Sequence, residues 1–374
     1  MQKLFTSEAV TSGHPDKMCD LISDSILDAY LKQDENSKVA CEVAIANDLV
    51  LIMGEITSRA TIDIEELVRN VICDIGYNND SGFNGHKVPI LVHLNNQSND
   101  IALGVNQHNI GAGDQGIMYG YATNETENYM PLTHTIACAL ASRLEYVRKS
   151  NIIKGLKPDG KTQVTLNYES SKVTAHTIVI SASHEENKNL HKLKEELIRE
   201  VIKPVLKDYL TNDTKIIINP TGKFTICGPI SDSGLTGRKI CVDTYGGLAH
   251  HGGGAFSGKD YTKVDRSGAY YARYVAKNII AAGLATKCEI SVSYAIGLSS
   301  PIGISIDTFK TNTIPETKIL EIINTIFDFS PKNIIKELNL KNVKYTDTTL
   351  YSHFGKKNLP WEQINKVKEI KDKL

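Results

Sequence analysis

The segment GHPDK, residues 13–17, combines residue types that suit a phosphate ligand. It stands at the start of a predicted helix, where unpaired backbone N–H groups and the helix dipole favour an anion. His14 and Lys17 would add positive charge, and Asp16 would be a hard oxygen ligand for Mg²⁺ that bridges phosphate oxygens. The competing interpretation is that His14 and Asp16 only cap the helix.

A second segment, HGGGAFSGKD at residues 251–260, contains the GxxxxGK frame of a phosphate-binding P-loop. Asp260 stands where a Mg²⁺-binding Ser or Thr should be, and the preceding TYGGLAHH is not an apolar strand, so we reject the P-loop fold. The glycines still let the backbone approach a polyphosphate closely, and Lys259 supplies charge. A flexible surface loop is the alternative.

Two further segments carry acidic and basic residues together. In KVDRS, residues 263–267, Asp265 opens a predicted helix as Asp16 does, so two carboxylates from separate segments could hold two Mg²⁺. In DSGLTGRK, residues 232–239, a glycine-containing turn carries Arg238 and Lys239, which suit a phosphate chain or a charged leaving group. A solvated basic pair is the alternative. The segments PDGK (158–161) and GAGDQG (111–116) are common turn sequences and are weak signals alone.

Hydrophobic periodicity and turn residues predict the elements that position these segments. Residues 38–46 and 49–56 form a predicted hairpin, which places Glu42 and Glu55 on strands. Residues 95–116 are polar and glycine-rich and favour a mobile loop or lid. The predicted helices are 15–31, 64–75, 132–148, 187–209 and 265–282, and the other predicted strands are 88–94, 162–168, 173–181, 215–218 and 289–296. Lys-rich helices around one more extended segment close the chain.

Composition limits the class of protein. At 374 residues the chain is long enough for two or three compact units, and its formal net charge of −1 gives no general attraction to nucleic acid or to an anionic membrane. The seven cysteines include no CxxC pair, which favours free thiols in a reducing compartment. No apolar stretch reaches membrane-spanning length, and Glu8 stands where a signal peptide would be apolar. We therefore expect a cytoplasmic protein.

Taken in order, six motifs resemble the S-adenosylmethionine synthetase (methionine adenosyltransferase) family over nearly the whole chain. They are GHPDK, GEIT (54–57), GAGDQGIMYGYATNET (111–126), PTGKF (220–224), DSGLTGRK and HGGGAFSGKDYTKVDRS. The resemblance implies an α/β fold with mixed sheets (α+β), in three structurally similar domains with pseudo-threefold symmetry. It implies a homodimer or a homotetramer, a dimer of dimers, with active sites between subunits. As a division of the sequence we assign 1–98 to the N-terminal domain, 111–227 to the central domain, 228–366 to the C-terminal domain and 99–110 to the mobile lid.

The reaction of this family explains the residue types. Methionine sulfur displaces the whole triphosphate from the ribose 5′ carbon of ATP, and the tripolyphosphate is then cleaved to pyrophosphate and phosphate. So charged a leaving group requires preorganised cations, whereas the neutral sulfur needs no base. The resemblance implies two Mg²⁺ per active site and one K⁺ per subunit. The alternatives are another ATP-dependent transferase, kinase or ligase, or a nucleotide-sensing protein without catalysis.

The resemblance also implies a role for each residue that matches a family motif. The catalytic residues would be His14, Lys161, Arg238 and Lys259. ATP would be bound by His14, Asp159, Gly160, Lys161, Lys223, Phe224, Asp232, Arg238, Lys239, Ala255 and Lys259. Methionine would be bound by Glu55, Gln97, Asp114, Asp232 and Lys263. The metal ligands would be Asp16 and Asp265 for Mg²⁺ and Glu42 for K⁺.

Two positions depart from the family's usual sequence. Asn99 replaces the proline that usually follows Gln97 and Ser98, and this should make the entry to the lid more flexible. Lys223 stands where some relatives carry arginine, which keeps the charge but loses the fork geometry.

Overall fold

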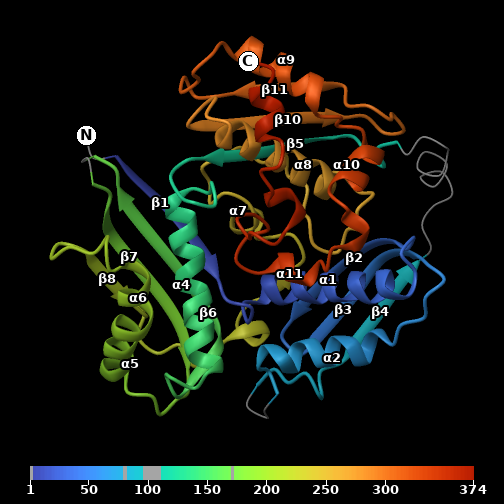
Figure 1. The fold of residues 1–374 in the computed structure, drawn as a ribbon. Coiled ribbons are helices and arrows are strands. Elements are labelled where there is room, and N and C mark those ends of the chain that lie inside the picture. The colour runs from blue at the N-terminus through green and yellow to red at the C-terminus, as the bar shows by residue number, and fades with distance from the viewer. Residues whose placement is uncertain (1–2, 79–81, 96–110, 170–171) are drawn as a thin grey trace.

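The computed structural model describes residues 3–78, 82–95, 111–169 and 172–374 (Figure 1). Its helices are α1 (Pro15–Gln33), α2 (Ile64–Ile75), α4 (Leu132–Lys149), α5 (Leu190–Leu197), α6 (Lys203–Leu206), α7 (Ile240–Asp243), α8 (Val264–Ala281), α9 (Glu316–Ile326), α10 (Pro331–Glu337), α11 (Thr346–Thr349) and α12 (Val367–Lys371). Its strands are β1 (Leu4–Val10), β2 (Lys38–Ala46), β3 (Leu49–Thr57), β4 (Ile90–Asn95), β5 (Gly116–Thr123), β6 (Leu156–Asn167), β7 (Thr174–His184), β8 (Lys215–Ile218), β9 (Gly234–Leu235), β10 (Lys287–Tyr294) and β11 (Gly303–Asp307).

The strands form three sheets, with the orders β4-β3-β2-β9, β1-β6-β7-β8 and β11-β10-β5. Each sheet is built on an antiparallel hairpin that follows a long helix: β2-β3 after α1, β6-β7 after α4, and β10-β11 after α8. In the first two sheets the hairpin is extended by a parallel strand, β4 or β8. These two sheets are therefore mixed, whereas the pairings of the third sheet are antiparallel among the described residues. The unit of a long helix followed by a hairpin occurs three times, as the fold class predicted.

The three units exchange their first strands. β1 pairs with β6, β5 pairs with β10, and β9 pairs with β2, so each sheet takes one strand from a segment that otherwise builds another sheet. Figure 1 shows the consequence: the three units surround a common middle, into which the C-terminal segment around α11 descends beside α1. The assigned segments 1–98, 111–227 and 228–366 thus divide the sequence, while the sheets interweave them.

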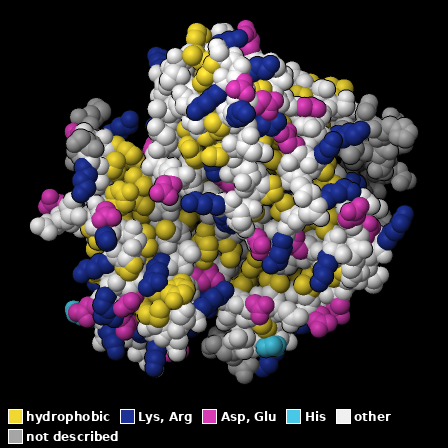
Figure 2. Space-filling model, viewed as in Figure 1, with side chains coloured by type: hydrophobic (Ala, Val, Ile, Leu, Met, Phe, Trp, Pro, Cys, Tyr) yellow, Lys and Arg dark blue, Asp and Glu magenta, His cyan; other side chains and the backbone are white. Residues whose placement is uncertain are grey.

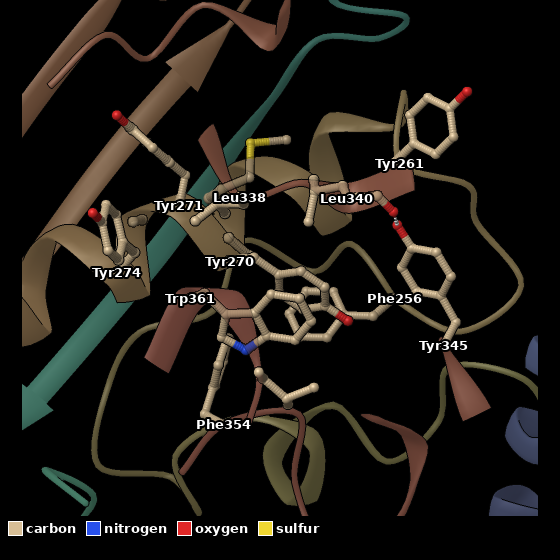
Figure 3. Packing of buried hydrophobic residues seen from close by; sticks show 14 of the residues in the cluster. Phe256, Tyr261, Tyr270, Tyr271, Tyr274, Leu338, Leu340, Tyr345, Phe354 and Trp361 are labelled. Atoms are coloured by element: carbon tan, nitrogen blue, oxygen red, sulfur yellow. Dashed lines mark hydrogen bonds between the residues drawn. The ribbon is translucent and has the colours of Figure 1, made fainter. Parts of the chain in front are cut away.

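The segment 251–260, which carries Lys259, is anchored in the hydrophobic core of the N- and C-terminal units. Tyr270 of α8 stacks on Trp361 with ring centroids 3.8 Å apart, and Phe256 packs edge-on against Tyr270 at 5.5 Å (Figure 3). Tyr345 belongs to the same buried cluster. Because core side chains are close-packed, Phe256 holds the backbone that leads to Lys259 in one place.

Several predicted elements differ from the observed ones. Strands β1, β5 and β9 were not predicted. The PDGK segment, expected to be a turn, lies within β6 at an irregularity in its pairing between Leu156 and Gly160. The predicted helix 187–209 is interrupted by a π-helical turn, Ile198–Ile202. Pro204 has no N–H to donate to the carbonyl of Glu200, and Arg143 Nε donates to that carbonyl instead, at 2.8 Å.

None of the helices in the described ranges is both long and apolar enough to cross a membrane. Lys and Arg side chains are interspersed with Asp and Glu over the face drawn in Figure 2, in keeping with the net charge near zero. All seven cysteines are free thiols.

Candidate active site

His14 is the N-cap of α1, and its protonation follows from its contacts. Its Nδ1 accepts a hydrogen bond from the backbone N–H of Asp16 at 3.2 Å, so the neutral ring carries its proton on Nε2. Burial, together with the charge of Lys239, lowers the pKa of His14 to about 4. The expectation that His14 adds positive charge is therefore wrong at neutral pH. His14 instead offers a neutral Nε2–H donor.

Lys17 does not face the phosphate-binding end of α1. It is buried, forms an ion pair with Asp243, lies 2.9 Å from Asp20, and donates to the carbonyl of Thr349 at 3.0 Å. Burial opposes its charge, but the two carboxylates raise the pKa of Lys17 overall. The prediction that Lys17 adds charge to an anion site is thus wrong, because a buried lysine requires its own partners.

Asp16 joins the first turn of α1 to the basic turn at residues 232–239. Its carboxylate forms an ion pair with Lys239, accepts from the backbone N–H of Leu235 at 3.0 Å, and lies 3.6 Å from Arg238 Nε. Burial opposes its ionised form, but the Lys239 and Leu235 contacts lower the pKa of Asp16. Asp16 is therefore a carboxylate that already faces two cations.

Two basic loops lie on the same edge of β2: the first loop, residues 232–239, and the second loop, residues 251–260. In the first loop, the N–H of Thr236 donates to the carbonyl of Val43 at 3.0 Å. In the second, the carbonyl of Gly258 accepts from the N–H of Cys41 at 2.9 Å. Glu42 lies between these two attachment points. Burial raises the pKa of Glu42, while the charge of Lys259 opposes that shift, so Glu42 and the second loop are electrostatically coupled.

The second loop, residues 251–260, packs against both the first loop, residues 232–239, and α8. A Cβ added to Gly237 would lie 2.4 Å from the Cβ of Ala255, and one added to Gly254 would lie 2.3 Å from Oδ1 of Asp265. Both positions therefore require glycine. Lys259 Nζ lies 2.6 Å from Asp265 Oδ2, so a second lysine–carboxylate pair mirrors that of Asp16. Asp265 lies in the first turn of α8, as predicted.

The central unit brings the PDGK segment beside the start of α1. A Cβ added to Gly13 would lie 2.4 Å from Pro158, and the charge of Lys161 contributes to the lowered pKa of His14. Lys161 itself is half-exposed and pairs with Glu8 at 2.8 Å. Asp159 is buried and accepts from the N–H of Gly228 at 2.9 Å, and burial raises its pKa to about 6. Gly160 is buried next to it.

Three other predicted residues, Lys223, Phe224 and Lys263, make contacts elsewhere among the described residues. Lys223 pairs with Glu186 and the N–H of Phe224 donates to His184 Nε2 at 3.0 Å, which ties both to the central unit. Lys263 pairs with Asp260.

Three acidic residues predicted to contact substrate are exposed. The charge of Asp232 opposes the lowering of the pKa of His14. Glu55 lies on β3, and Asp114 lies two residues before Gly116, where an added Cβ would lie 3.8 Å from Asp265. Gln97 and the predicted lid at 99–110 lie outside the described residues.

The donor set at this junction suits Mg²⁺ bound together with a polyphosphate. Within the described ranges no three His, Cys, Asp or Glu side chains converge on a common point. Asp16 and Asp265 instead present single carboxylates, each beside a lysine. Mg²⁺ is usually held by one or two carboxylates plus substrate phosphates, so these residues fit that ion.

Two residues that touch the basic loops, Asp20 and Asp24, were not predicted from the sequence. Both are fully buried on α1, and each accepts a backbone N–H from one loop. The available signal was spacing: aspartate recurs at 16, 20, 24 and 28, which places four carboxylates along one side of a helix.

Comparison with known proteins gives matches over nearly the whole chain. Residues 2–99, 109–224 and 226–363 match the models of the N-terminal, central and C-terminal domains of S-adenosylmethionine synthetase. A Clostridium tetani protein named S-adenosylmethionine synthase is 50% identical over 389 aligned positions, which cover 100% of both chains.

Proposed function

The chain belongs to the S-adenosylmethionine synthetase family and makes S-adenosylmethionine from ATP and L-methionine, and we propose that the junction of α1, β2 and the two basic loops carries out this reaction. Methionine sulfur attacks the ribose 5′ carbon of ATP and displaces tripolyphosphate, which is then hydrolysed to pyrophosphate and phosphate. The enzyme must therefore stabilise a highly charged leaving group twice, once as it departs and once as it is cleaved.

The observation that carries the assignment is the pair of lysine–carboxylate contacts. Asp16 faces Lys239, Asp265 faces Lys259, and the Gly237–Ala255 contact brings the two loops together. In each pair the charge of the lysine offsets that of the carboxylate. A triphosphate bound with Mg²⁺ would supply both kinds of partner: phosphate oxygens for the lysines and metal ions for the carboxylates.

His14 would act on the departing oxygen. With Nδ1 committed to the Asp16 N–H, the Nε2–H is the free donor, and the low pKa keeps the ring neutral. The neutral ring can donate this hydrogen bond to the oxygen that gains negative charge, and it does not have to release a proton first. Arg238, Lys239 and Lys259 would collect the rest of the phosphate charge, with Lys161 from the central unit.

We assign one Mg²⁺ to Asp16, a second to Asp265 and one K⁺ to Glu42. When bound, the Mg²⁺ ions would neutralise phosphate oxygens and so make tripolyphosphate a better leaving group. Glu42 lies on β2 between the two loop attachment points and is influenced by Lys259. A cation at Glu42 would therefore change the electrostatic environment of the loop that carries Lys259.

The other substrate contacts follow from the family motifs. On the ATP side these are Asp159, Gly160, Lys223, Phe224, Asp232 and Ala255. On the methionine side they are Glu55, Gln97, Asp114, Asp232 and Lys263. The position of Gly13 against Pro158 supports a shared pocket between the first turn of α1 and the PDGK segment.

We further propose that a second copy of the chain covers the outer face of the β2-β3 sheet and completes the site. On β2 and β3, one set of alternating residues is buried under the helices and the other set, which includes Leu51, Met53, Glu42 and Glu55, is not. Glu42 is directly opposite Met53 in the register. Apolar residues beside functional carboxylates on one uncovered face favour a homodimer, or a dimer of dimers, with active sites at the interface. The seven free thiols support a cytoplasmic location.

Product analysis tests the assignment of the reaction. The purified protein is mixed with ATP, methionine, Mg²⁺ and K⁺, and products are identified by mass spectrometry beside a reaction without methionine. We expect S-adenosylmethionine, pyrophosphate and phosphate only in the complete reaction. ADP or AMP without S-adenosylmethionine would leave a phosphate site but remove the roles of Glu55 and Gln97. No reaction would favour the nucleotide-sensing alternative.

A further inference from the structure

Gly237 and Gly258 occupy corresponding positions in the two basic loops. Each comes directly before a cation of the proposed site, Arg238 or Lys259. Each has a left-handed backbone, with φ of 77° at Gly237 and 81° at Gly258. Only glycine adopts this conformation readily, so the direction of the chain at each cation depends on its glycine.

The backbone N–H of each glycine donates to a carboxylate on α1. Gly237 donates to Oδ1 of Asp20 at 2.8 Å, and Gly258 donates to Oδ1 of Asp24 at 2.9 Å. Both aspartates are 0% exposed. They lie four residues apart, which places them on the same side of the helix at a separation of about 6 Å along its axis. One rigid helix therefore sets both loops.

The second loop is held on both sides of its cation. Arg266 of α8 pairs with Asp24 through two contacts, at 2.8 and 3.1 Å, and the same guanidinium donates to the carbonyl of Lys259 at 2.9 Å. The N–H of Gly258 donates to Asp24 and the carbonyl of Lys259 accepts from Arg266, so the buried Asp24–Arg266 ion pair holds the backbone on both sides of Lys259. Bidentate pairs of this kind fix geometry as well as charge. Close packing limits movement further, because a Cβ on Gly258 would lie 2.0 Å from the carbonyl of Cys41.

The first loop has a matching arrangement around Asp20. Lys17 lies 2.9 Å from Oδ2 of Asp20 and compensates its buried charge, while Oδ1 holds the loop. The counterpart of Arg266 is therefore Lys17, which explains why this lysine is buried instead of facing substrate.

We infer that Asp20 and Asp24 are positioning residues of adenosyl transfer: through the N–H groups of Gly237 and Gly258 they fix Arg238 and Lys259 where the triphosphate leaves. This inference rests on the proposed function, because it takes Arg238 and Lys259 as the groups that stabilise the leaving group. Because both aspartates are fully buried, neither would touch substrate. Their effect on the reaction passes through the loops.

Asp28 supplies a matched control on the same helix. It continues the same four-residue spacing and also accepts backbone N–H groups, from Tyr345 at 2.7 Å and Thr346 at 2.9 Å. Those residues belong to the C-terminal segment and carry no cation of the proposed site. Asp28→Asn should therefore affect stability without affecting the turnover number.

The test is a double-mutant cycle on kcat for S-adenosylmethionine formation, with folding checked by circular dichroism and thermal unfolding. We expect Asp20→Asn to lower kcat by about 10- to 100-fold, since misplacement by about 1 Å can have that effect. In an Arg238→Ala background the same change should lower kcat by less than about threefold, because the group that Asp20 positions is gone. Asp24→Asn should behave likewise with Lys259→Ala. In a Lys259→Ala background, Asp20→Asn should lower kcat by the same factor as it does in the wild type.

The results distinguish a failure of the proposed function from a failure of the positioning role. Normal kcat in Arg238→Ala would overturn the proposed function at that residue. A reduced kcat in Arg238→Ala with an undiminished Asp20→Asn effect would overturn the positioning role alone, as would an Asp28→Asn variant that loses as much kcat as Asp20→Asn. If Asp20→Asn does not fold, Asp20→Glu runs the same cycle, because it keeps the charge beside Lys17 and moves the acceptor by one methylene.

Discussion

Asp16 and Lys239 are 223 residues apart in the sequence and form an ion pair at the start of α1. The Lys259–Asp265 pair repeats the arrangement within a span of six residues. Each pair joins a proposed phosphate-binding cation to a proposed metal ligand. Cations and carboxylates thus meet in pairs where a polyphosphate and its metal ions would bind together.

Replacement of Lys259 should remove adenosyl transfer and leave the fold intact. Lys259→Ala deletes a cation aimed at the leaving group, and loss of one preorganised charge contact lowers kcat by about 10²- to 10³-fold. The rate of S-adenosylmethionine formation measures this. Lys318→Ala, on the exposed face of α9 where Lys318 lies 3.3 Å from Glu321, is the control and should keep normal kcat. Normal turnover in Lys259→Ala would contradict the geometry of the second loop.

Glu42 should be required for activation by K⁺. Glu42→Gln removes the charge that would hold the ion between the two loop attachment points, so the ratio of rates with and without K⁺ should fall close to one. Initial rates over a K⁺ titration check this, with Glu35→Gln as the control, since Glu35 is exposed near Lys341. An unchanged response to K⁺ in Glu42→Gln would remove this residue as the ligand.

His134 should make stability depend on pH. Burial lowers its pKa from 6.5 to about 4, so between these values the unfolded chain binds a proton that the folded protein does not. The free energy of unfolding therefore rises with pH through this window. The contribution of His134 to it decreases as the pH falls below 6.5. At pH 5 this loss amounts to about 2 kcal/mol. His134→Gln should lack it.

Denaturant unfolding of wild type and His134→Gln at pH 8 and pH 5 measures the effect. The difference in unfolding free energy between the two proteins should shift by about 2 kcal/mol in favour of the variant on going to pH 5. An equal response of the two proteins to pH would show that His134 is not the group responsible.

A charge on the outer face of β3 should separate the subunits. Met53→Glu places a carboxylate opposite Glu42, where we propose that a second copy packs, and an unpaired charge in an interface costs several kcal/mol. Size-exclusion chromatography with light scattering should show a monomer with little activity. Leu190→Glu, at an exposed leucine of α5, should leave the oligomer intact. A Met53→Glu protein with the wild-type mass would exclude this face from the interface.

Much of the local structure follows from sequence patterns. Helix α1 begins at Pro15 as predicted, because a proline at the first turn and a regular apolar face agree. The hairpin of β2 and β3 has the predicted turn at Asn47, whose positive φ suits asparagine. The motif resemblance identified the family correctly, as the three domain matches confirm.

The long-range arrangement could not be predicted in the same way. The exchange of β1, β5 and β9 pairs strands that are far apart in the chain, and no local pattern specifies such pairing. The orientation of Lys17 could not be predicted for the same reason: its partner Asp243 is 226 residues away. The protonation of His14 depends on burial, which sequence spacing does not report. The site roles carried over from the family stay predictions until variants are measured.

The dependence of S-adenosylmethionine formation on Mg²⁺ in Asp16→Asn and Asp265→Asn tests the central claim most directly. Each change keeps the size of the side chain and removes the charge that would hold a metal ion beside the leaving group. We expect each variant to be folded and to lose nearly all turnover at Mg²⁺ concentrations that saturate the wild type, while Asp347→Asn, at an exposed residue of α11, behaves as wild type. Wild-type rates with an unchanged Mg²⁺ dependence in both variants would contradict the account.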